Sequence, residues 1–493
     1  MVVTSTAPPR PATGRPAQRS SDAKVPLSLL AVAAYLAALW WLAPRSSEFA
    51  VTTSARIAIV GMVLAFAAVA GMGRGRWLGA GGVYLIVFSL FHLGLAPMLA
   101  LGQDVPDFDN RGRVPWWIEN RPVGPALFAV SVGIGAYALG LRIGNRLGAR
   151  SRLRSSGPVI DSHDERRAAA MALALTAVGV LGWIAFTVSR GGIGIFLSSY
   201  ADYREATEEG LLPILYLLIS LGVALCAVAP DHKWSRWGFR LVGLFAFLAA
   251  LLGLRGEILF PAAAAVVVLS RRGRLRPDPR RWILLAIVLL SVISMVRSVR
   301  ASGLSDIDLA TVDANPLHGA VELGHSLRPV AEVIEWQSSF AEPAGGRTYL
   351  RPVERLAAKA LPIAIPAASE DPYIMNVVMK QRVGSIGFSP VAEGYENWGL
   401  PGAFNYMLVV GMLLGYLDRR RATVSALVAT VVVLVPLLIQ IRNSFVPVPL
   451  NLVLGTLVWA AVFRPRRNGA DERRQPTVAR VTSRPRAGSF ASP

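Results

Sequence analysis

The sequence predicts an all-α polytopic membrane protein, with about twelve transmembrane helices and one large helical loop outside the membrane. Three observations predict it: the apolar composition, the length of the apolar stretches and the placement of charge. Hydrophobic residues make up 53% of the 493 residues and charged residues only 17%, whereas the surface of a soluble domain needs about 25%. Lipid is therefore the expected solvent for most of the chain.

The apolar stretches have the length of membrane-spanning helices. A helix needs about 20 apolar residues to cross roughly 30 Å of hydrocarbon, because backbone polar groups must be paired there. The stretches are 25–44, 56–72, 77–101, 123–143, 168–188, 211–229, 241–254, 258–270, 282–299, 400–417, 423–441 and 446–463. The chain then divides into a disordered tail (1–24), nine helices (25–299), a large loop (300–399), three helices (400–463) and a disordered basic tail (464–493).

The formal net charge of +20 lies at the ends of these stretches. With both termini in the cytoplasm, the cytoplasmic segments hold 33 of the 51 Lys and Arg residues but only 9 of the 31 Asp and Glu residues. Positive charge on the cytoplasmic side is the rule for membrane proteins. We therefore predict a multi-pass protein of the bacterial cytoplasmic (inner) membrane. A soluble protein of this charge would suggest a nucleic-acid partner, but here none is expected.

Two of the predicted helices are too short for a full crossing. Between Arg240 and Arg271, 30 residues must hold both helices, which leaves each of them about 22 Å of length. The turn between them, at Arg255, is therefore expected at membrane depth, where a charged side chain is costly. A single tilted helix is the alternative, but it would move the basic cluster that begins at Arg271 to the outer side.

The loop 300–399 is far longer than an ordinary connection and is expected to be a functional element with its own helices. Apolar spacing and proline positions predict helices at 316–327, 329–338 and 351–360. The stretch 383–399, rich in glycine, is expected to be irregular until the next helix begins. Two smaller outer loops carry aromatic residues that are either interfacial anchors or sugar-stacking groups, namely Trp116, Trp117, Tyr200 and Tyr203.

Arginines stand at or just inside the outer ends of the predicted helices, on the side where the charge rule disfavours them. They are Arg190, Arg255, Arg297, Arg300 and Arg442. An arginine at membrane depth is retained when it pairs with an acid, a backbone carbonyl or an anionic ligand. Snorkelling or a structural ion pair explains each one alone. For the set, a shared anion is the simpler explanation, and guanidinium groups match the oxygens of a diphosphate.

Two groups of polar residues in the large loop are candidates for acid–base chemistry. Glu322 and His325 are three residues apart, so on a helix they share a face and suit a general base and the residue that orients it. Arg328 completes this group, for which a solvated helix face is the alternative. Glu393 and Glu396, near the return into the membrane, form a second pair that suits taking a proton from a hydroxyl.

The sequence offers weak support for a metal or a cofactor. His318 precedes Glu322 by four residues, but one Glu-x-x-His unit without a partner motif is a weak ligand set, and Cys226 is the single cysteine. A glycine-rich phosphate loop followed by Lys does not occur, which argues against nucleotide-driven transport. We therefore expect neither a metal nor a cofactor.

The run GFSPVAEGYENWGLPG, residues 387–402, resembles the end of the large periplasmic loop of O-antigen polysaccharide polymerases of the Wzy type. In that family a Gly-Phe-Ser-Pro is followed by Ala-Glu, an aromatic residue, an Asn and a Gly that opens the next helix. VELGHSLRPV (321–330) and GRTYL (346–350) are similar to further elements of the family. The resemblance covers about 189–462, and Trp398 departs from it where a Phe is usual.

The resemblance implies a membrane glycosyltransferase of GT-C-like architecture, with an outer loop that closes over a cavity on the extracytoplasmic side. Such enzymes move a growing chain from undecaprenyl diphosphate onto the next lipid-linked oligosaccharide repeat unit, without a metal. The expected roles are Arg255, Arg300 and Arg442 on the diphosphate, with Arg328 helping, and Glu322 or Glu393 on the acceptor hydroxyl, oriented by His325.

The resemblance also implies partners beyond the substrate: membrane lipid, a flippase and a chain-length regulator. Two other functions stay open at this point. One is a ligase that moves finished polysaccharide to another acceptor, and the other is a twelve-helix transporter of lipid-linked sugars. Transporters of that size usually have related halves, whereas here only the second half carries the loop 300–399.

Overall fold

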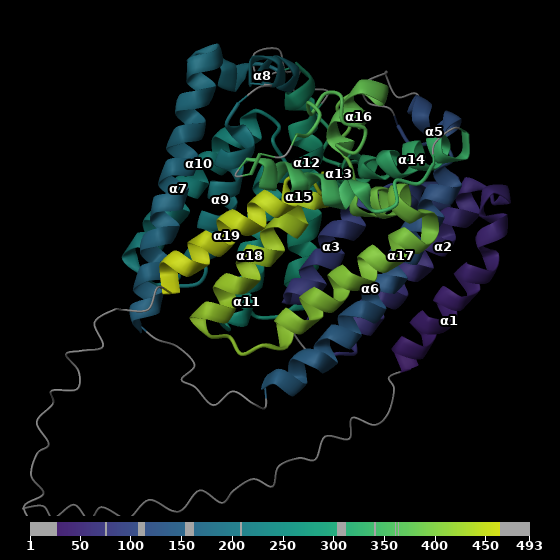
Figure 1. Ribbon diagram of the computed structural model, residues 1–493, viewed down its shortest axis with the longest axis horizontal. Coiled ribbons are helices and arrows are strands. Elements are labelled where there is room, and N and C mark those ends of the chain that lie inside the picture. The colour runs from purple at the N-terminus through teal and green to yellow at the C-terminus, as the bar shows by residue number, and fades with distance from the viewer. Residues whose placement is uncertain are drawn as a thin grey trace, which may run out of the picture.

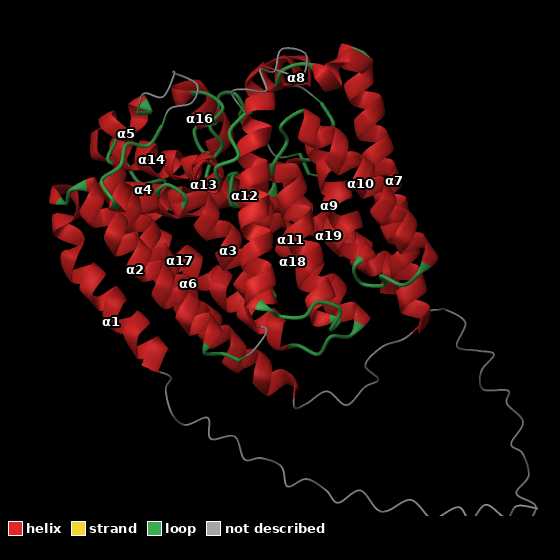
Figure 2. Cartoon of the chain, turned by 180° about the vertical axis from the view of Figure 1, so that it is seen from behind, coloured by secondary structure: helices red, strands yellow, loops and turns green. Residues whose placement is uncertain are grey.

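The structure, a computed structural model, describes residues 27–73, 76–106, 114–152, 162–207, 210–302, 312–339, 342–359, 361–362 and 364–463. The predicted tails 1–24 and 464–493 lie outside these ranges. Within them the regular structure is helical throughout (Figures 1 and 2). The all-α prediction is therefore confirmed.

The helices follow the apolar stretches closely, because each predicted range overlaps at least one helix. They are α1 (Leu27–Leu42), α2 (Val51–Ala70), α3 (Ala80–Leu93), α4 (Ala96–Ala100), α5 (Trp116–Asn120), α6 (Val123–Arg152), α7 (Ser162–Gly191), α8 (Tyr200–Thr207), α9 (Leu212–Cys226), α10 (Lys233–Leu251), α11 (Gly256–Arg271), α12 (Pro279–Ser302), α13 (Pro316–Gly324), α14 (Arg328–Ser339), α15 (Arg347–Ala358), α16 (Met375–Val383), α17 (Pro390–Arg419), α18 (Val424–Gln440) and α19 (Val448–Phe463).

Six segments of the described chain are long and apolar enough to cross a membrane: Leu27–Glu48, Val51–Ala70, Val123–Ala149, Ser162–Gly191, Pro279–Arg297 and Pro390–Arg419. A seventh arises if the bent pair of α8 and α9 counts as one span. α3, α18 and α19 are apolar but have only 14, 17 and 16 residues, about 21 to 26 Å of helix. Hydropathy does not separate a full crossing from a shorter helix buried inside a bundle, so the twelve crossings and the GT-C likeness stay predictions.

The pair α6 and α17 forms a tightly packed seam along the bundle (Figure 1). Glycines on each helix face the backbone of the other. A Cβ atom added at Gly144 would lie 1.9 Å from the carbonyl oxygen of Met412, and one at Gly411 would lie 2.3 Å from that of Tyr137. Small residues at such spacing let two membrane helices approach closely. This seam was not predicted.

The short helices of the predicted large loop gather at one end of the bundle. α13, α14, α15 and α16 lie in the upper part of Figure 1, above the long helices α6 and α17 and near α5. The predicted helices at 316–327, 329–338 and 351–360 correspond to α13 with a following 3-10 turn, to α14 and to α15. Helix α16 was not predicted. We call this group of short helices the cap.

The stretch 383–399 differs from its prediction. It was expected to be irregular, but α17 begins at Pro390, and the Ser389 hydroxyl caps the helix by accepting hydrogen bonds from the backbone N–H groups of Val391 and Ala392. A serine followed by proline is a strong helix start. A kink at Trp398 and Gly399, where Gly399 has φ +62°, divides α17 into a short cap segment and a long apolar segment.

The hairpin predicted around Arg255 is present. α10 ends at Leu251 and α11 begins at Gly256, with Gly253 at φ +72° in the turn. The alternative of one continuous tilted helix is therefore wrong. Arg255 precedes the first residue of α11 and is only 8% exposed, so its charge lies inside the protein.

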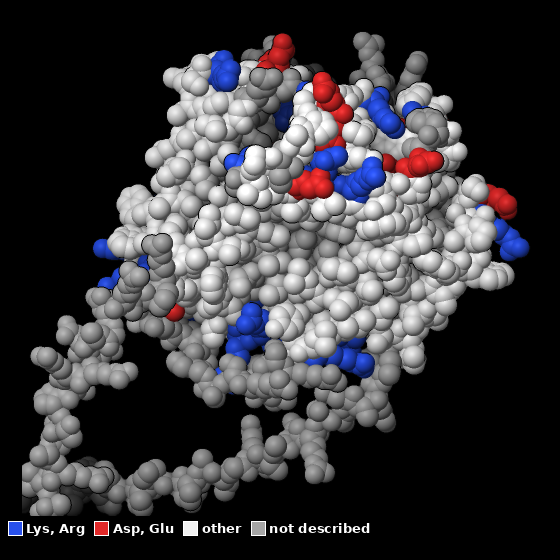
Figure 3. Space-filling model, in the orientation of Figure 1, with Lys and Arg blue, Asp and Glu red and all other residues white. Residues whose placement is uncertain are grey.

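Charged side chains lie at the two ends of the bundle, with an apolar belt between them (Figure 3). On the face in that view, the cap end carries both acidic and basic residues, whereas the opposite end carries mainly basic ones. Large exposed apolar side chains on the bundle include Val60, Val178, Phe247, Leu284 and Leu457. Such a belt is the surface that lipid covers.

Candidate active site

Arg255 and Glu322 form a buried ion pair between α11 and α13. The guanidinium Nη2 donates to the carboxylate Oε1 at 2.5 Å, and the two side chains are only 6% and 16% exposed. The Arg255 Nη1 atom is buried and has no hydrogen-bond partner in the described part of the chain. The Glu322 carboxylate therefore uses the Nη2 donor of the guanidinium, and the Nη1 donor remains unused.

A second carboxylate in the cap, that of Glu332, binds two guanidinium groups. Arg121 Nε donates to it at 2.7 Å and Arg328 Nε at 3.1 Å, while the Glu332 side chain is 3% exposed. The Arg121 guanidinium also lies over the Trp116 ring, 4.7 Å from its centre. Arg328 was predicted as a substrate-binding residue, but Arg121 and Glu332 were not identified. The four-residue spacing of Arg328 and Glu332 was the one signal in the sequence.

The aromatic residues of the outer loops have separate surroundings. Trp117 is 4% exposed and its ring meets the edge of the His325 imidazole, with ring centres 5.9 Å apart. Tyr203 is buried and its hydroxyl interacts with the Tyr216 hydroxyl at 2.7 Å. Neither residue is an exposed interfacial anchor. Trp116, in contrast, is 54% exposed.

Arg442 lies on the loop after α18, against the beginning of α17. Its backbone carbonyl accepts a hydrogen bond from the Phe388 N–H at 3.2 Å. Gly387 has φ +81°, and a Cβ atom there would lie 2.7 Å from the same carbonyl oxygen. The Arg442 side chain is half-buried, and among the described residues it has neither an ion pair nor a hydrogen bond. Its guanidinium is therefore not engaged in an ion pair with the described part of the chain.

Glu393 is fully buried beside the same loop. The Phe445 backbone N–H donates to its Oε2 atom, whereas its Oε1 atom has no hydrogen-bond partner of good geometry in the described chain. The side chains of Thr348 and Gln440 face the carboxylate. The run 387–402 thus packs on the Arg442 loop and brings the Glu393 carboxylate next to it, although the two residues are 49 positions apart.

Further buried polar atoms surround Glu393 without partners. The Tyr349 hydroxyl and the Gln440 Nε2 atom form no hydrogen bond of good geometry within the described residues, although Asn397 lies beside the first and Glu393 beside the second. Tyr349 stacks on Tyr406 with ring centres 5.3 Å apart and planes 1° from parallel. Burial raises the pKa of the Tyr349 hydroxyl well above its usual value, so the group remains a donor. Several unpaired polar atoms in one place mark a site for a polar ligand or water.

The remaining predicted residues lie elsewhere. Arg190 is exposed at the end of α7 and lies over the Phe186 ring, 5.4 Å from its centre. Arg297 is 3.9 Å from Asp313, which also contacts His318. Arg300 belongs to α12, but its side chain is outside the described part of the structure. The structure thus packs the loop that carries Arg442 against Glu393, and pairs Arg255 with Glu322, as two separate groups.

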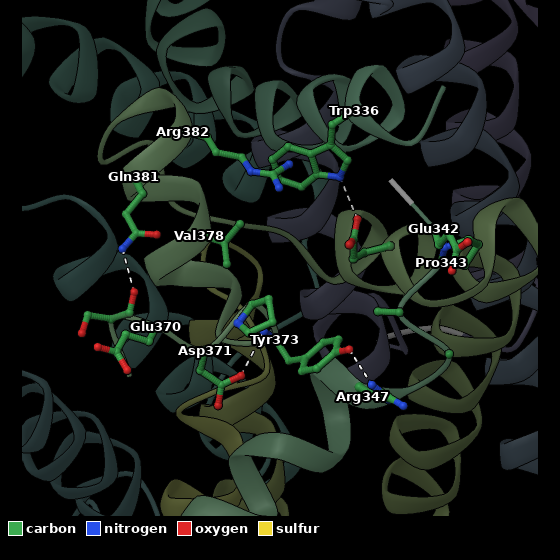
Figure 4. Close-up of a pocket in the computed structure, with 15 residues that line it drawn as sticks. Trp336, Glu342, Pro343, Arg347, Glu370, Asp371, Tyr373, Val378, Gln381 and Arg382 are labelled. Carbon is green, nitrogen blue, oxygen red and sulfur yellow. Dashed lines mark hydrogen bonds between the residues drawn. The ribbon is translucent and has the colours of Figure 1, made fainter. Parts of the chain in front are cut away.

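A pocket of about 680 Å³ opens in the cap between α14, α15, α16 and the short segment of α17 (Figure 4). Of the acid–base candidates, Glu396 lines it. The Trp336 indole N–H donates to the Glu396 carboxylate at 2.8 Å, and the Arg382 guanidinium lies 4.6 Å from the centre of the Trp336 ring. The pocket was not predicted, because its walls come from four segments of the cap.

The fold and the site together define an integral membrane protein, helical throughout its described part, with a charged cap whose carboxylates pair with arginines. The family model described as O-antigen polysaccharide polymerase Wzy matches residues 163–463. The chain therefore belongs to the O-antigen polysaccharide polymerase Wzy family, as the resemblance of the run 387–402 predicted.

Protein CapE from Staphylococcus aureus is a similar protein, 26% identical over 287 residues. The match covers 56% of this chain, and the chain spans 62% of the length of CapE. A search of the solved structures gave no match. The residues matched by the family extend over α7 to α19 and include both the Arg255–Glu322 pair and the Arg442–Glu393 group.

Proposed function

We propose that the protein joins undecaprenyl-diphosphate-linked oligosaccharide repeat units into a surface polysaccharide, by glycosyl transfer without a metal. Membership of the Wzy family supports the reaction class. The observation that carries the proposal is the Arg442–Glu393 group, in which a guanidinium without an acidic partner lies on the loop that holds a buried carboxylate with one unpaired oxygen.

The chemistry uses these two groups in opposite ways. The acceptor hydroxyl oxygen attacks C1 of the donor sugar, the bond from C1 to the diphosphate oxygen breaks, and the electron pair remains on the diphosphate. Arg442, with Arg255, stabilises the charge that develops there, because preorganised guanidinium groups need no reorganisation during the reaction. Glu393 accepts the hydroxyl proton late in the transition state, since a hydroxyl is far less acidic than a carboxylic acid.

Glu322 has a different role in this proposal. Its carboxylate is held by Arg255, and the Nη2–Oε1 distance is 2.5 Å. A carboxylate that neutralises a guanidinium is a weaker base than one with an unpaired oxygen. We therefore assign Glu322 to positioning Arg255, and Glu393 to the acceptor hydroxyl. His325, Arg328, Arg297, Arg300 and Arg190 remain candidates for substrate contacts around them.

The proposal places the cap on the extracytoplasmic side of the inner membrane, with both termini in the cytoplasm. The donor and the acceptor are then both lipid-linked units in the outer leaflet, which a flippase supplies. A chain-length regulator is a further proposed partner. The carrier lipid runs along the apolar belt, while its sugars rise into the cap.

A reconstitution experiment tests the proposal. Purified protein in liposomes receives a single lipid-linked repeat unit, and the products are separated by size. A polymerase gives a ladder of products, because each product serves again as donor. A ligase, which needs a different acceptor, leaves the unit unchanged. An unchanged unit together with transfer to a separately added acceptor would overturn the polymerase assignment in favour of a ligase.

A further inference from the structure

The cap pocket has the size and the lining of a ligand site. Its volume of about 680 Å³ lies within the usual range of roughly 300–1,000 Å³. In Figure 4, Trp336 and Tyr373 lie on opposite sides of it, with Glu370 and Gln381 on one flank and Glu342 on the other. The pocket lies in the charged cap and not in the apolar belt, so its ligand is a polar group.

The protein itself uses only part of the polar lining. The Asp371 carboxylate is paired with Arg351 at 3.1 Å and Arg355 at 3.4 Å. In contrast, the Glu342 and Glu370 carboxylates are exposed and have neither a hydrogen bond nor an ion pair within the described residues. The free groups of the pocket are therefore mainly acceptors, and they require a ligand that brings several donors.

The charge of the lining selects among such ligands. Four carboxylates line the pocket, those of Glu342, Glu370, Asp371 and Glu396. They are balanced by the guanidinium groups of Arg347 and Arg382 in the lining, and of Arg351 and Arg355 on Asp371. A phosphate or a uronic acid would therefore find no excess of positive charge there. A neutral sugar ring offers several hydroxyl donors, which match the unpaired Glu342 and Glu370 carboxylates.

The pocket is joined rigidly to the buried carboxylate of the proposed active site. Glu396 and Glu393 are three residues apart on the short segment of α17, which corresponds to about 4.5 Å along the helix axis. The opposite wall is tied to the same turn, because the Ala344 N–H donates to the Glu396 carbonyl at 2.9 Å and the Gly346 N–H to the Asn397 side chain at 2.8 Å. A ligand in the pocket is therefore held at a fixed place relative to Glu393.

We propose that this pocket binds a neutral sugar residue of the acceptor repeat unit through its hydroxyl groups, as a subsite beside Glu393. The inference rests on the proposed function. The reacting sugar of a donor is bonded directly to its diphosphate at the membrane surface. The acceptor instead reacts at the end farthest from its lipid, so its reacting sugars stand above the apolar belt, where the pocket lies.

The test uses two soluble probes on the full-length protein in detergent. One is the oligosaccharide that mild acid releases from the lipid-linked repeat unit of the source bacterium, and the other is inorganic pyrophosphate. The variant carrying both Glu342→Gln and Glu370→Gln is expected to bind the oligosaccharide at least about tenfold more weakly, because two charge-assisted hydrogen bonds are lost. Its binding of pyrophosphate is expected to stay unchanged. Arg442→Ala is expected to show the reverse.

Controls separate failure of the inference from failure of the proposed function. Glu119→Gln removes an exposed carboxylate of α5, beside the cap and outside the pocket, and should bind both probes as the unchanged protein does. The inference is overturned if the unchanged protein does not bind the oligosaccharide, or if the double variant binds it equally well. The proposed function fails separately, if liposomes with the unchanged protein form no ladder.

Discussion

At the scale of single residues, the partners of each arginine separate structural from chemical roles. Arg328 and Arg121 share the buried Glu332 carboxylate, so the cap needs them as an ion-pair cluster. Arg442 has no acidic partner in the described chain, and Arg255 has one for only part of its donor fork. The two arginines with unused donors are therefore the ones on which we expect catalysis to depend most.

Arg442→Ala and Arg255→Ala are each expected to abolish the product ladder in liposomes. Lys at either position is expected to restore little, because a point charge does not reproduce the bidentate geometry of a guanidinium. Arg45→Ala is the matched control: this exposed arginine lies over the Trp41 ring, and its loss should leave the ladder unchanged. Normal chain length in both alanine variants would refute the assignment of these residues to the diphosphate.

Glu393→Gln is expected to fold normally but to lower the rate of a single transfer by a factor of about 10²–10⁴, the usual contribution of a general base. The amide oxygen still accepts from the Phe445 N–H, so the loop keeps its position. A quench-flow measurement with one round of transfer gives the rate, and the melting temperature in detergent reports folding. An unchanged rate would remove Glu393 from the reaction.

At the scale of elements, the α6–α17 seam depends on the absence of side chains. Gly144→Ala would place a Cβ atom 1.9 Å from the Met412 carbonyl oxygen, so the helices must separate. We expect a loss of about 1–3 kcal/mol in the free energy of unfolding. Thermal unfolding in detergent measures it.

Gly243→Ala on α10 is the control for this change. A Cβ atom added at Gly243 has no neighbouring atom within 4 Å beyond the backbone of its own helix. The substitution also improves helix propensity. It should therefore unfold at or slightly above the temperature of the unchanged protein. Equal melting temperatures for Gly144→Ala and Gly243→Ala would show that the seam tolerates separation.

Local signals predicted some elements and not others. The hairpin at Arg255 was predicted because 30 residues between two basic positions leave a fixed length for two helices. The start of α17 was not predicted, because the glycine content of 383–399 indicated an irregular loop. The Ser389 cap and Pro390 indicate a helix start instead. The helix start is determined here by the cap and not by the glycine content, since the Ser389 hydroxyl accepts hydrogen bonds from two backbone N–H groups of the first turn.

At the scale of the whole molecule, the sequence predicted an all-helical membrane protein and its family. It did not predict which residues far apart in the sequence come together at the site. The Arg442–Glu393 group and the Arg121–Glu332 pair join residues 49 and 211 positions apart, and hydropathy carries no information about such contacts. The cap pocket was missed for the same reason, because its walls are separate in sequence.

The side of the membrane that the cap occupies is a prediction for labelling experiments. The single cysteine, Cys226, is buried, so it gives little background reaction. Glu370→Cys in the cap should react with an impermeant maleimide in intact spheroplasts, whereas Arg276→Cys, exposed at the basic end, should react only after permeabilisation. The reverse pattern would invert the topology and place the proposed site in the cytoplasm.

The glycine seam also limits how the protein can admit a lipid-linked substrate. The backbones of α6 and α17 are in contact, since a Cβ atom added at Gly140 would lie 2.1 Å from the Leu408 carbonyl oxygen. We therefore expect these two helices neither to slide past each other nor to separate. They behave as one rigid pair, and the short segment of α17 that bears Glu393 is attached to this pair. A lateral entrance for the carrier lipid is therefore expected between other helices, which contact each other through side chains that can change conformation.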